Sequence, residues 1–414
     1  MRQRMLELIG VAAAITVVSL VSVAGQIRGD APKTTAGPAP KTSWGEPSLQ
    51  GSWDVVPYQI PLQRPAKYKD QAFFTAAQIA EFDKIRAAMP GNETRTVRGT
   101  EADVAGAYNS VYTRRSPTGD RTSLIVDPPD GRIPPVTAAV TKRRVEIEAF
   151  RLMLLENTNA CKNKLPGCEG GKYTGVPSPR RFDPVPYMTA ITTVNTGGPP
   201  WARIINRQDG PEEHGLGMRC MSAMLPDFTG YRQIVQSPGA ISITYDTGQG
   251  QGWQRIIPVD GSPHLPANVR TWWGDSRGRW EGNTLVVDVT NFNGFNDFNG
   301  STDKLHLIER WTRTGPDTLE YVVTFDDSTS WTKPWTVKQE YSKLADQINQ
   351  VYKEPRCHEG NYAGVGWLSD ARAVEKAFAE GRGPDPTTLN SATPTGSANT
   401  LGVASGDEDA DPLG

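Results

Sequence analysis

Between Tyr231 and Tyr341 the sequence repeats one pattern, in which short segments of alternating apolar and polar residues are separated by Gly, Asn and Asp. Alternation with a period of two is typical of β-strands that bury one face, and the separating residues favour tight turns. Seven or more such strands, connected by hairpins, must bury their apolar faces, and closure into a barrel also removes exposed sheet edges. We therefore predict a mainly β fold, an antiparallel barrel or strongly curled sheet with a ligand-sized interior and a few peripheral α-helices.

The alternation also predicts which side chains face the interior. In the segment 305–313, one side carries Leu305, Leu307, Glu309, Trp311 and Arg313. In the next segment, the matching residues are Leu319, Tyr321, Val323 and Phe325. A carboxyl group is thus expected among apolar neighbours.

Composition supports this fold class and disfavours some partners. The 414 residues include 41 Gly and 33 Pro, and the hydrophobic content is 37%, which favours a turn-rich β protein over a helical one. The length leaves the number of domains open, because all-β folds often exceed about two hundred residues as one unit. The formal net charge of -2 provides no strong field for nucleic acid or an anionic membrane surface, so neither is an expected partner.

The N-terminus has the three parts of a secretory signal. Arg2 and Arg4 precede an apolar run from Leu8 to Val23, and Ser22-Val23-Ala24 supplies small residues for cleavage. The alternative is an uncleaved anchor, since the run is close to the lower limit for spanning a bilayer. We expect residues 1–24 to be a signal peptide and the mature protein to be periplasmic or secreted, without stable membrane insertion.

The rest of the chain divides by composition. Residues 25–47 are rich in Pro, Thr and Lys and are expected to form a flexible leader. Residues 48–383 are predicted to be a single β-rich domain with a helical insertion near 137–157. The tail at 384–414 is expected to be disordered, because it contains too few apolar residues to bury.

A further helix is expected from Ala76 to Met89, because its start is well marked. Thr75 and Gln78 have the spacing of a capping box, and Phe74 and Ile79 have that of a hydrophobic staple. Its apolar stripe is expected to consist of Ile79, Phe82 and Ile85, and Pro90-Gly91 ends it.

Four cysteines fit an oxidising compartment. Cys161 and Cys168 enclose only six residues and could form a local disulfide, which would leave Cys220 and Cys357 to join distant parts of the chain. The other pairings and free buried thiols remain alternatives. A zinc site is disfavoured because the chain has no CxxC and its four histidines are scattered, at positions 214, 264, 306 and 358.

Several families of enzymes are disfavoured because their motifs are missing. The sequence contains no GxSxG elbow, no P-loop and no GxGxxG. Classical serine hydrolysis, nucleotide use and dinucleotide redox chemistry are therefore disfavoured. No bound metal or other cofactor is expected, and the sequence carries no signal for a particular oligomeric state.

Glu309 is the first candidate catalytic residue. Burial among apolar groups disfavours the charged form of a carboxyl, which could then act as an acid near neutral pH. The alternatives are an ion pair with an arginine such as Arg279 or Arg310, or a strand end that faces outward.

The second candidate is the segment Cys357-His358-Glu359-Gly360-Asn361-Tyr362. His358 and Glu359 could supply acid–base chemistry, and Asn361 and Tyr362 could bind a ligand. Consecutive strand residues point in opposite directions, so this requires a turn, which Gly360 permits. The alternative is a disulfide-anchored loop whose polar groups satisfy the backbone.

The third candidate is the charged run 275–282, expected as a turn that leads into a strand. Here Asp275, Arg277, Arg279 and Trp280 are candidate ligand-binding residues, because arginine forks suit a carboxylate or phosphate. The alternative is that Asp275 and Glu281 are internal partners of these arginines.

Tryptophan is the remaining signal, with 11 in the chain. Flat indole faces bind aromatic ligands and sugars, and they also fill barrel cores. Two further candidates for ligand contact are Trp311 and Trp335.

Several of these sequence segments, in a fixed order along the chain, are similar to those of a known family. The runs GDSRGRWEGNTLVVDVTNF, LHLIERWTR, WTKPWTV, CHEGNY and TSLIVDPPDGRIPP resemble a large family of exported bacterial proteins with no assigned activity, over roughly residues 48–372. The resemblance implies a shared fold and export, and leaves the function open. The triplet Gly51-Ser52-Trp53 also resembles the start of lipocalin-like (calycin) barrels.

Two classes of function follow, with a scaffold role as a weaker third. The first is a small-molecule-binding barrel that holds an apolar or aromatic ligand. The second is a cofactor-independent hydrolase, lyase or isomerase that uses Glu309 or His358 as acid or base. We favour the binding protein, because no triad, metal cluster or nucleotide motif requires an enzyme.

Overall fold

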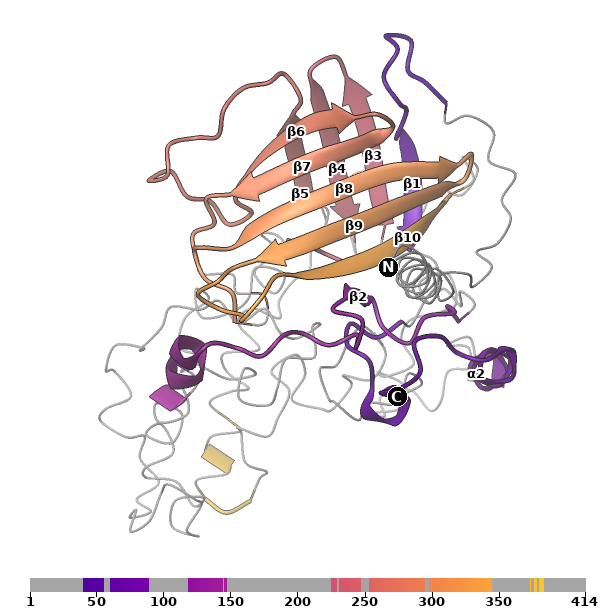
Figure 1. Cartoon of the computed structure of the whole chain (residues 1–414), viewed down its shortest axis with the longest axis vertical. Coiled ribbons are helices and arrows are strands. Elements are labelled where there is room, and N and C mark those ends of the chain that lie inside the picture. The colour runs from indigo at the N-terminus through magenta and orange to yellow at the C-terminus, as the bar shows by residue number, and fades with distance from the viewer. Residues whose placement is uncertain are drawn as a thin grey trace, which may run out of the picture. The chain divides into compact units, whose positions relative to one another are not determined.

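Ten strands form a single sheet in the computed structural model of the chain (Figure 1). The structure describes residues 40–55, 60–88, 118–143, 145–146, 225–228, 231–246, 253–294, 298, 300–344, 373, 376–377 and 380–382. All of them belong to the compact unit that runs from Ala39 to Gly414.

The strands follow one another around the sheet almost in chain order. They are β1 (Gly51–Val55), β2 (Ile125–Asp127), β3 (Tyr231–Ser237), β4 (Ala240–Asp246), β5 (Trp253–Pro258), β6 (Asp275–Glu281), β7 (Thr284–Thr290), β8 (His306–Gly315), β9 (Thr318–Asp326) and β10 (Trp335–Lys343). Their order in the sheet is β5-β4-β3-β1-β10-β9-β8-β7-β6, and β2 pairs with β10 beside this path. Every pairing is antiparallel, so the fold class predicted from the alternation is confirmed.

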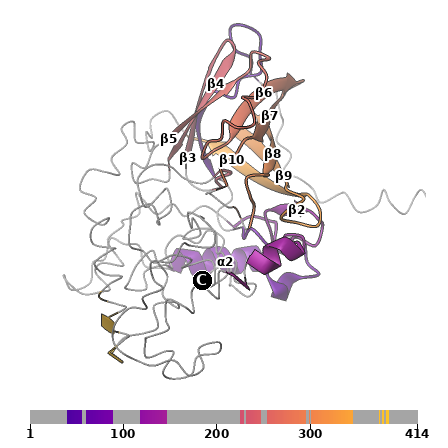
Figure 2. The ribbon, with the colours of Figure 1, turned by 90° about the vertical axis from the view of Figure 1, so that its left-hand side faces the viewer.

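The sheet curls into a nearly closed barrel whose two ends, β5 and β6, approach each other (Figure 2). Eight antiparallel steps separate these strands in the sheet order, so β5 and β6 run in the same direction. Parallel neighbours need a crossover connection, which here is residues 259–274. A Cβ added to Gly278 on β6 would lie 3.0 Å from Ile257 and 3.3 Å from the carbonyl oxygen of Pro258 on β5. Glycine therefore permits the close approach at this seam.

The predicted inward faces are confirmed for β8 and β9. The five residues of the 305–313 set are all buried, and Glu309 has no exposed surface. It lies in register with Val287 on β7 and Val323 on β9. The four inward residues of β9 are buried too. Cross-strand rows of this kind form one continuous core along the inside of the barrel.

The expected turn at 275–282 is wrong, because residues 275–281 form β6 and pair with β7 along its whole length. The glycine of the run that faces the seam, Gly278, packs against β5, and the charged residues lie on the outer face. The actual turn is at Gly282, whose φ of 61° is a conformation that glycine adopts without strain.

The helix expected from Ala76 is confirmed as α2 (Ala76–Ala88). The capping box forms, since the Thr75 backbone N–H donates to Gln78 Oε1 at 2.8 Å and the Gln78 N–H donates to Thr75 Oγ1 at 3.2 Å. Phe82 packs with Tyr68 of the 3-10 helix η1 (Ala66–Tyr68) and with Phe74, whereas Ile85 is exposed. The buried stripe is therefore narrower than the spacing predicts.

Other expectations are only partly within the described residues. Residues 138–143 and 145–146 are helical, and the remainder of the 137–157 insertion lies outside the described ranges. Residues 40–47 of the expected leader adopt a defined turn, which Gln236 anchors by donating to the Pro47 carbonyl oxygen at 3.1 Å. The expected signal peptide, the four cysteines and the tail lie outside the described ranges. In the described part of the chain, no helix has the length and apolar character needed to cross a bilayer.

Candidate functional site

The barrel interior contains a polar cluster around Glu309. Arg255 of β5 donates from Nη1 to Glu309 Oε2 at 2.8 Å, and the Tyr321 hydroxyl of β9 donates to Oε1 at 2.9 Å. Both contacts use the carboxyl group as an acceptor, which is the role of an ionised carboxylate. This geometry matches the alternative of an ion-paired carboxylate, with Arg255 as the partner instead of Arg279 or Arg310.

Arg255 connects three parts of the barrel wall. Besides Glu309, its Nε and Nη2 donate to Ser276 Oγ across the β5–β6 seam at 3.0 and 2.8 Å, and its Nη1 lies 3.3 Å from the Tyr245 hydroxyl. Burial is the largest influence on the pKa of Arg255 and acts to lower it, but the Glu309 charge, Tyr245 and the hydrogen bonds to both together outweigh burial, so the pKa is raised. The guanidinium therefore stays charged and joins the two ends of the sheet.

A second buried arginine, Arg232 of β3, completes the cluster. Its guanidinium lies over the Tyr245 ring at 4.5 Å and over the Tyr341 ring at 5.8 Å. It pairs with Asp227, whose Oδ2 is 3.3 Å from Nη2 and whose carbonyl oxygen accepts at 2.6 Å. The interior cluster is defined here as Arg232, Tyr245, Arg255, Glu309, Tyr321 and Tyr341.

The charges of the interior cluster balance once Asp227, the partner of Arg232, is counted with it, and the tyrosines of the cluster are neutral. Each guanidinium has a carboxylate partner, Glu309 for Arg255 and Asp227 for Arg232. Burial raises the pKa of the three tyrosine hydroxyls, so all three keep their protons. Hydroxyls that keep their protons can serve as hydrogen-bond donors.

Several buried donors find no hydrogen-bond partner among the described residues. The Tyr341 hydroxyl and the Trp311 indole N–H lie in this group, and their rings are 6.0 Å apart. The indole N–H groups of four other tryptophans share this condition, at positions 253, 280, 331 and 335. Buried polar groups are nearly always hydrogen-bonded, so a set of unpartnered donors is unusual for a barrel core.

The tryptophan candidates differ in their surroundings. Trp311 lies beside the interior cluster, with its ring 4.1 Å from Tyr321. Trp335 stacks on Phe325 at 3.9 Å with an interplanar angle of 1°, which is core packing. Trp280 is half-buried and packs against the core from β6. Of the three, Trp311 is thus the one that the fold brings next to buried polar groups.

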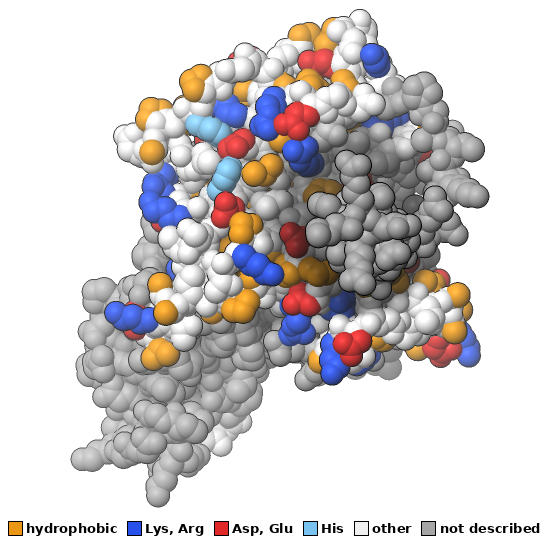
Figure 3. Space-filling view, in the orientation of Figure 1, with side chains coloured by type: hydrophobic (Ala, Val, Ile, Leu, Met, Phe, Trp, Pro, Cys, Tyr) orange, Lys and Arg blue, Asp and Glu red, His pale blue; other side chains and the backbone are white. Residues whose placement is uncertain are grey.

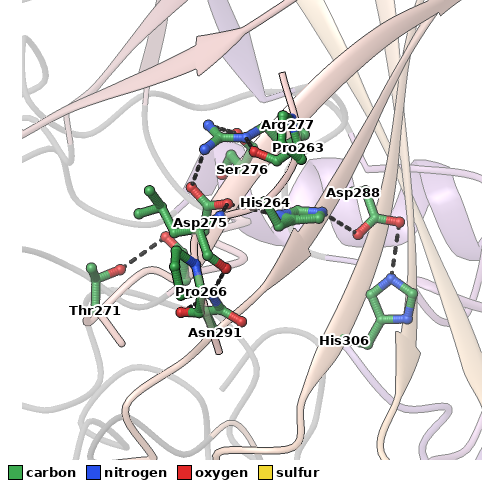
Figure 4. A network of polar contacts seen from close by, with 12 residues as sticks. Pro263, His264, Pro266, Thr271, Asp275, Ser276, Arg277, Asp288, Asn291 and His306 are labelled. Atoms are coloured by element: carbon green, nitrogen blue, oxygen red, sulfur yellow. Dashed lines mark hydrogen bonds and ion pairs between the residues drawn. The ribbon is translucent and has the colours of Figure 1, made fainter. Parts of the chain in front are cut away.

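A second polar network lies on the outside of the barrel (Figure 4). His264 of the 259–274 connection places Nδ1 2.7 Å from Asp275 Oδ2 of β6 and Nε2 3.0 Å from Asp288 Oδ1 of β7. His306 of β8 places Nε2 3.1 Å from Asp288 Oδ2. We call these four residues the outer His–Asp chain. It ties the crossover connection to three successive strands.

Asp275 is buried, the other three residues of the outer chain are partly exposed, and Asp288 and His306 shift each other's pKa. The hydrogen bond from His306 is the main cause of a lowered pKa of Asp288, and the same bond raises the pKa of His306. Figure 3 shows both histidines at the molecular surface beside acidic side chains. In the described ranges, no group of three or more His, Cys, Asp or Glu side chains has the arrangement of a metal site.

The arginines of β6 have internal partners, as the alternative for this run predicts. Arg277 pairs with Asp275 at 3.2 Å and donates to the Pro263 carbonyl oxygen at 2.7 Å. Arg279 contacts Glu281 at 2.7 Å, and Arg310 contacts the other oxygen of Glu281 at 3.0 Å. These candidates therefore lie on the outer face, apart from the interior cluster. His358, Glu359, Asn361 and Tyr362 lie outside the described residues.

Sequence reasoning missed most of the groups that surround Glu309. Alternation around Trp253 and Ile257 already implied an inward Arg255, and the same rule applied to the last strand implied Tyr341. Arg232 could have been found in this way as well. His264 lies in a connection without periodicity, so no signal in the sequence pointed to it.

Comparison with known proteins identifies no relative. No family model matches the sequence, no curated protein is significantly similar to it, and no solved structure is significantly similar either.

Proposed function

We propose that this protein is a small-molecule-binding β-barrel whose ligand contacts the interior cluster. The single observation that carries the proposal is the buried Tyr341 hydroxyl, which lacks a hydrogen-bond partner in the described ranges. Its ring lies 6.0 Å from that of Trp311, whose indole N–H is equally unpartnered. A bound molecule with an acceptor atom would satisfy such donors. Ligand sites typically combine aromatic walls with a few convergent polar groups, which is the composition of this cluster.

Binding fits the interior cluster better than acid–base catalysis does. Glu309 accepts hydrogen bonds on both oxygens, and its partner Arg255 has a raised pKa and keeps its charge. A general acid must carry a proton that it can release to a substrate. The cluster thus favours recognition of a ligand. The proposal places the protein in the periplasm or outside the cell, on the basis of its expected signal peptide.

Native mass spectrometry of the full protein, purified from its own cell envelope, tests the proposal. We expect a mass above that of the mature chain. Gentle collisional activation should release the extra mass as a small molecule. The adduct should be reduced in a Tyr341→Phe and Trp311→Phe double variant, which keeps an aromatic ring at each position and removes both donors.

The matched control is Arg279→Gln, a change on the outer face that should leave the adduct in place. A wild-type protein that carries no small molecule, or an adduct equally abundant in the double variant, contradicts an interior site at these donors.

A further inference from the structure

The interior cluster also restricts the chemistry of its ligand, an inference that rests on the proposed function. We infer that the barrel takes a neutral, largely aromatic molecule with an oxygen acceptor, such as a ketone, ester or ether, in preference to a carboxylate or phosphate. Charge balance, the type of unpartnered groups and the arrangement of the rings support this choice.

Charge balance disfavours an anionic ligand. Arg255 and Arg232 are each already paired with a carboxylate, at 2.8 and 3.3 Å. The four side chains are almost completely removed from solvent, with exposures of 0 to 7%. An incoming anion would either displace Glu309 or Asp227 from its partner or remain as an uncompensated buried charge. Either change costs several kcal/mol, so a neutral ligand is preferred.

The unpartnered groups require an acceptor on the ligand. An indole nitrogen can only donate, so Trp311 Nε1 needs an oxygen or similar atom opposite it. The Tyr341 hydroxyl keeps its proton, because burial raises its pKa. Both groups therefore match a carbonyl or ether oxygen, and neither compensates the full charge of a carboxylate.

Aromatic rings on two sides of the cluster favour a flat ligand body. On β4, β5 and the crossover connection, Tyr245, Trp253 and Trp273 form a mutual contact with ring centroids 5.5 to 6.3 Å apart. On β8, β9 and β10, Trp311 contacts Tyr321 and Tyr341 at 4.1 and 6.0 Å. Arg232 and the Arg255–Glu309 pair join these two groups. Offset and edge contacts with such rings stabilise an aromatic ligand beyond the burial of its area.

Isothermal titration calorimetry with three probes of nearly equal shape tests the inference on the full protein. The probes are 2-acetonaphthone, 2-ethylnaphthalene and 2-naphthoate, which carry a neutral acceptor, no polar group and an anion. We expect the ketone to bind tightest and the carboxylate weakest at neutral pH. The Tyr341→Phe variant should weaken ketone binding about 5-fold, the contribution of one neutral hydrogen bond, and leave hydrocarbon binding unchanged.

A second variant and three further outcomes keep the test decisive. Trp311→Phe removes the other donor and also makes the ring smaller, so it should weaken binding of both the ketone and the hydrocarbon, but of the ketone more, which gives a second result if Tyr341→Phe does not fold. Tightest binding by 2-naphthoate overturns the inference while leaving the binding function intact. The inference is overturned as well if both variants lose affinity for the ketone and for the hydrocarbon by the same factor. If none of the three probes binds, the inference fails, and the proposed function then depends on the native mass spectrum alone.

Discussion

The interior cluster and the outer His–Asp chain use similar chemical groups in opposite surroundings. Inside the barrel, Glu309 and Arg255 have side chains that are 0% and 3% exposed, whereas His264, Asp288 and His306 are 30 to 34% exposed. Buried ion pairs lose much of their attraction to the cost of desolvation, yet removal of one partner strands the other charge. Half-exposed pairs are screened by water and salt. The comparison predicts large, salt-independent effects inside and small, titratable effects outside.

The largest effect is expected from Glu309→Gln, which leaves the Arg255 charge buried without its carboxylate. The free energy of unfolding should fall by about 3 kcal/mol or more. Urea unfolding followed by tryptophan fluorescence measures the change. An Arg255→Met and Glu309→Met double variant should regain much of the loss, since it removes both charges. A loss below about 1 kcal/mol in the single variant would show that the interior is better solvated than its burial indicates.

A smaller loss is expected from Asp275→Asn, at the buried end of the outer chain. Asp275 accepts from the Leu265 N–H at 3.0 Å and contacts His264 and Arg277, so the change should lower the free energy of unfolding by about 2 kcal/mol. The matched control is Asp303→Asn, because this exposed aspartate pairs with Arg270 at 2.7 Å. We expect the control to lose less than about 1 kcal/mol in the same unfolding experiment. Equal losses would mean that the burial of Asp275 has no energetic consequence.

Asp288→Asn should lower the free energy of unfolding by about 0.5 to 1 kcal/mol, and the size of this effect should depend on pH. Because the pKa of His306 is raised in the folded protein, His306 stabilises the fold at pH values below its pKa in the unfolded chain, about 6.5. This contribution disappears as the pH rises through the pKa of His306 in the folded protein. Because the pKa of Asp288 is lowered in the folded protein, Asp288 stabilises the fold at pH values above its pKa in the unfolded chain, about 3.9. This contribution disappears as the pH falls through the pKa of Asp288 in the folded protein.

The difference between wild type and Asp288→Asn should therefore be largest between about pH 4 and 6.5. Thermal unfolding of both proteins across this range measures it, and a repeat in about 1 M salt should reduce it. If the stability difference between the two proteins is constant from acid to alkaline pH, the hydrogen bonds of the outer chain do not contribute to stability as proposed.

The smallest effect on stability is expected from Tyr341→Phe in ligand-free protein. Its hydroxyl makes no hydrogen bond in the described ranges, so its removal should change the free energy of unfolding by less than about 0.5 kcal/mol or stabilise the fold. Tyr321→Phe is the matched control, because its hydroxyl donates to Glu309 at 2.9 Å. We expect the control to lose about 1.5 kcal/mol or more in urea unfolding. A comparable loss in both variants would mean that Tyr341 has a polar partner after all.

The alternation of the strands determined much of this fold by itself. It placed Glu309, Trp311 and Tyr321 inside the barrel before any coordinates, because side-chain direction in a strand follows a period of two. The capping box at Thr75 likewise determined where α2 begins, since the interaction is local in sequence. The run 275–281 shows the limit of local rules, because glycine and charge suggested a turn where pairing with β7 makes a strand.

Only the tertiary structure decided the partners. Arg255 lies 54 residues from Glu309, and it became the partner because curling of the sheet brings β5 opposite β8. The pairing of β6 with β7 brought together the two carboxylates that His264 contacts, although the connection that carries His264 has no periodicity. Which inward groups meet depends on how many strands separate them around the barrel and where the seam falls. Those quantities follow from the packing of the whole sheet, whereas a strand's own residues specify only which way each side chain points.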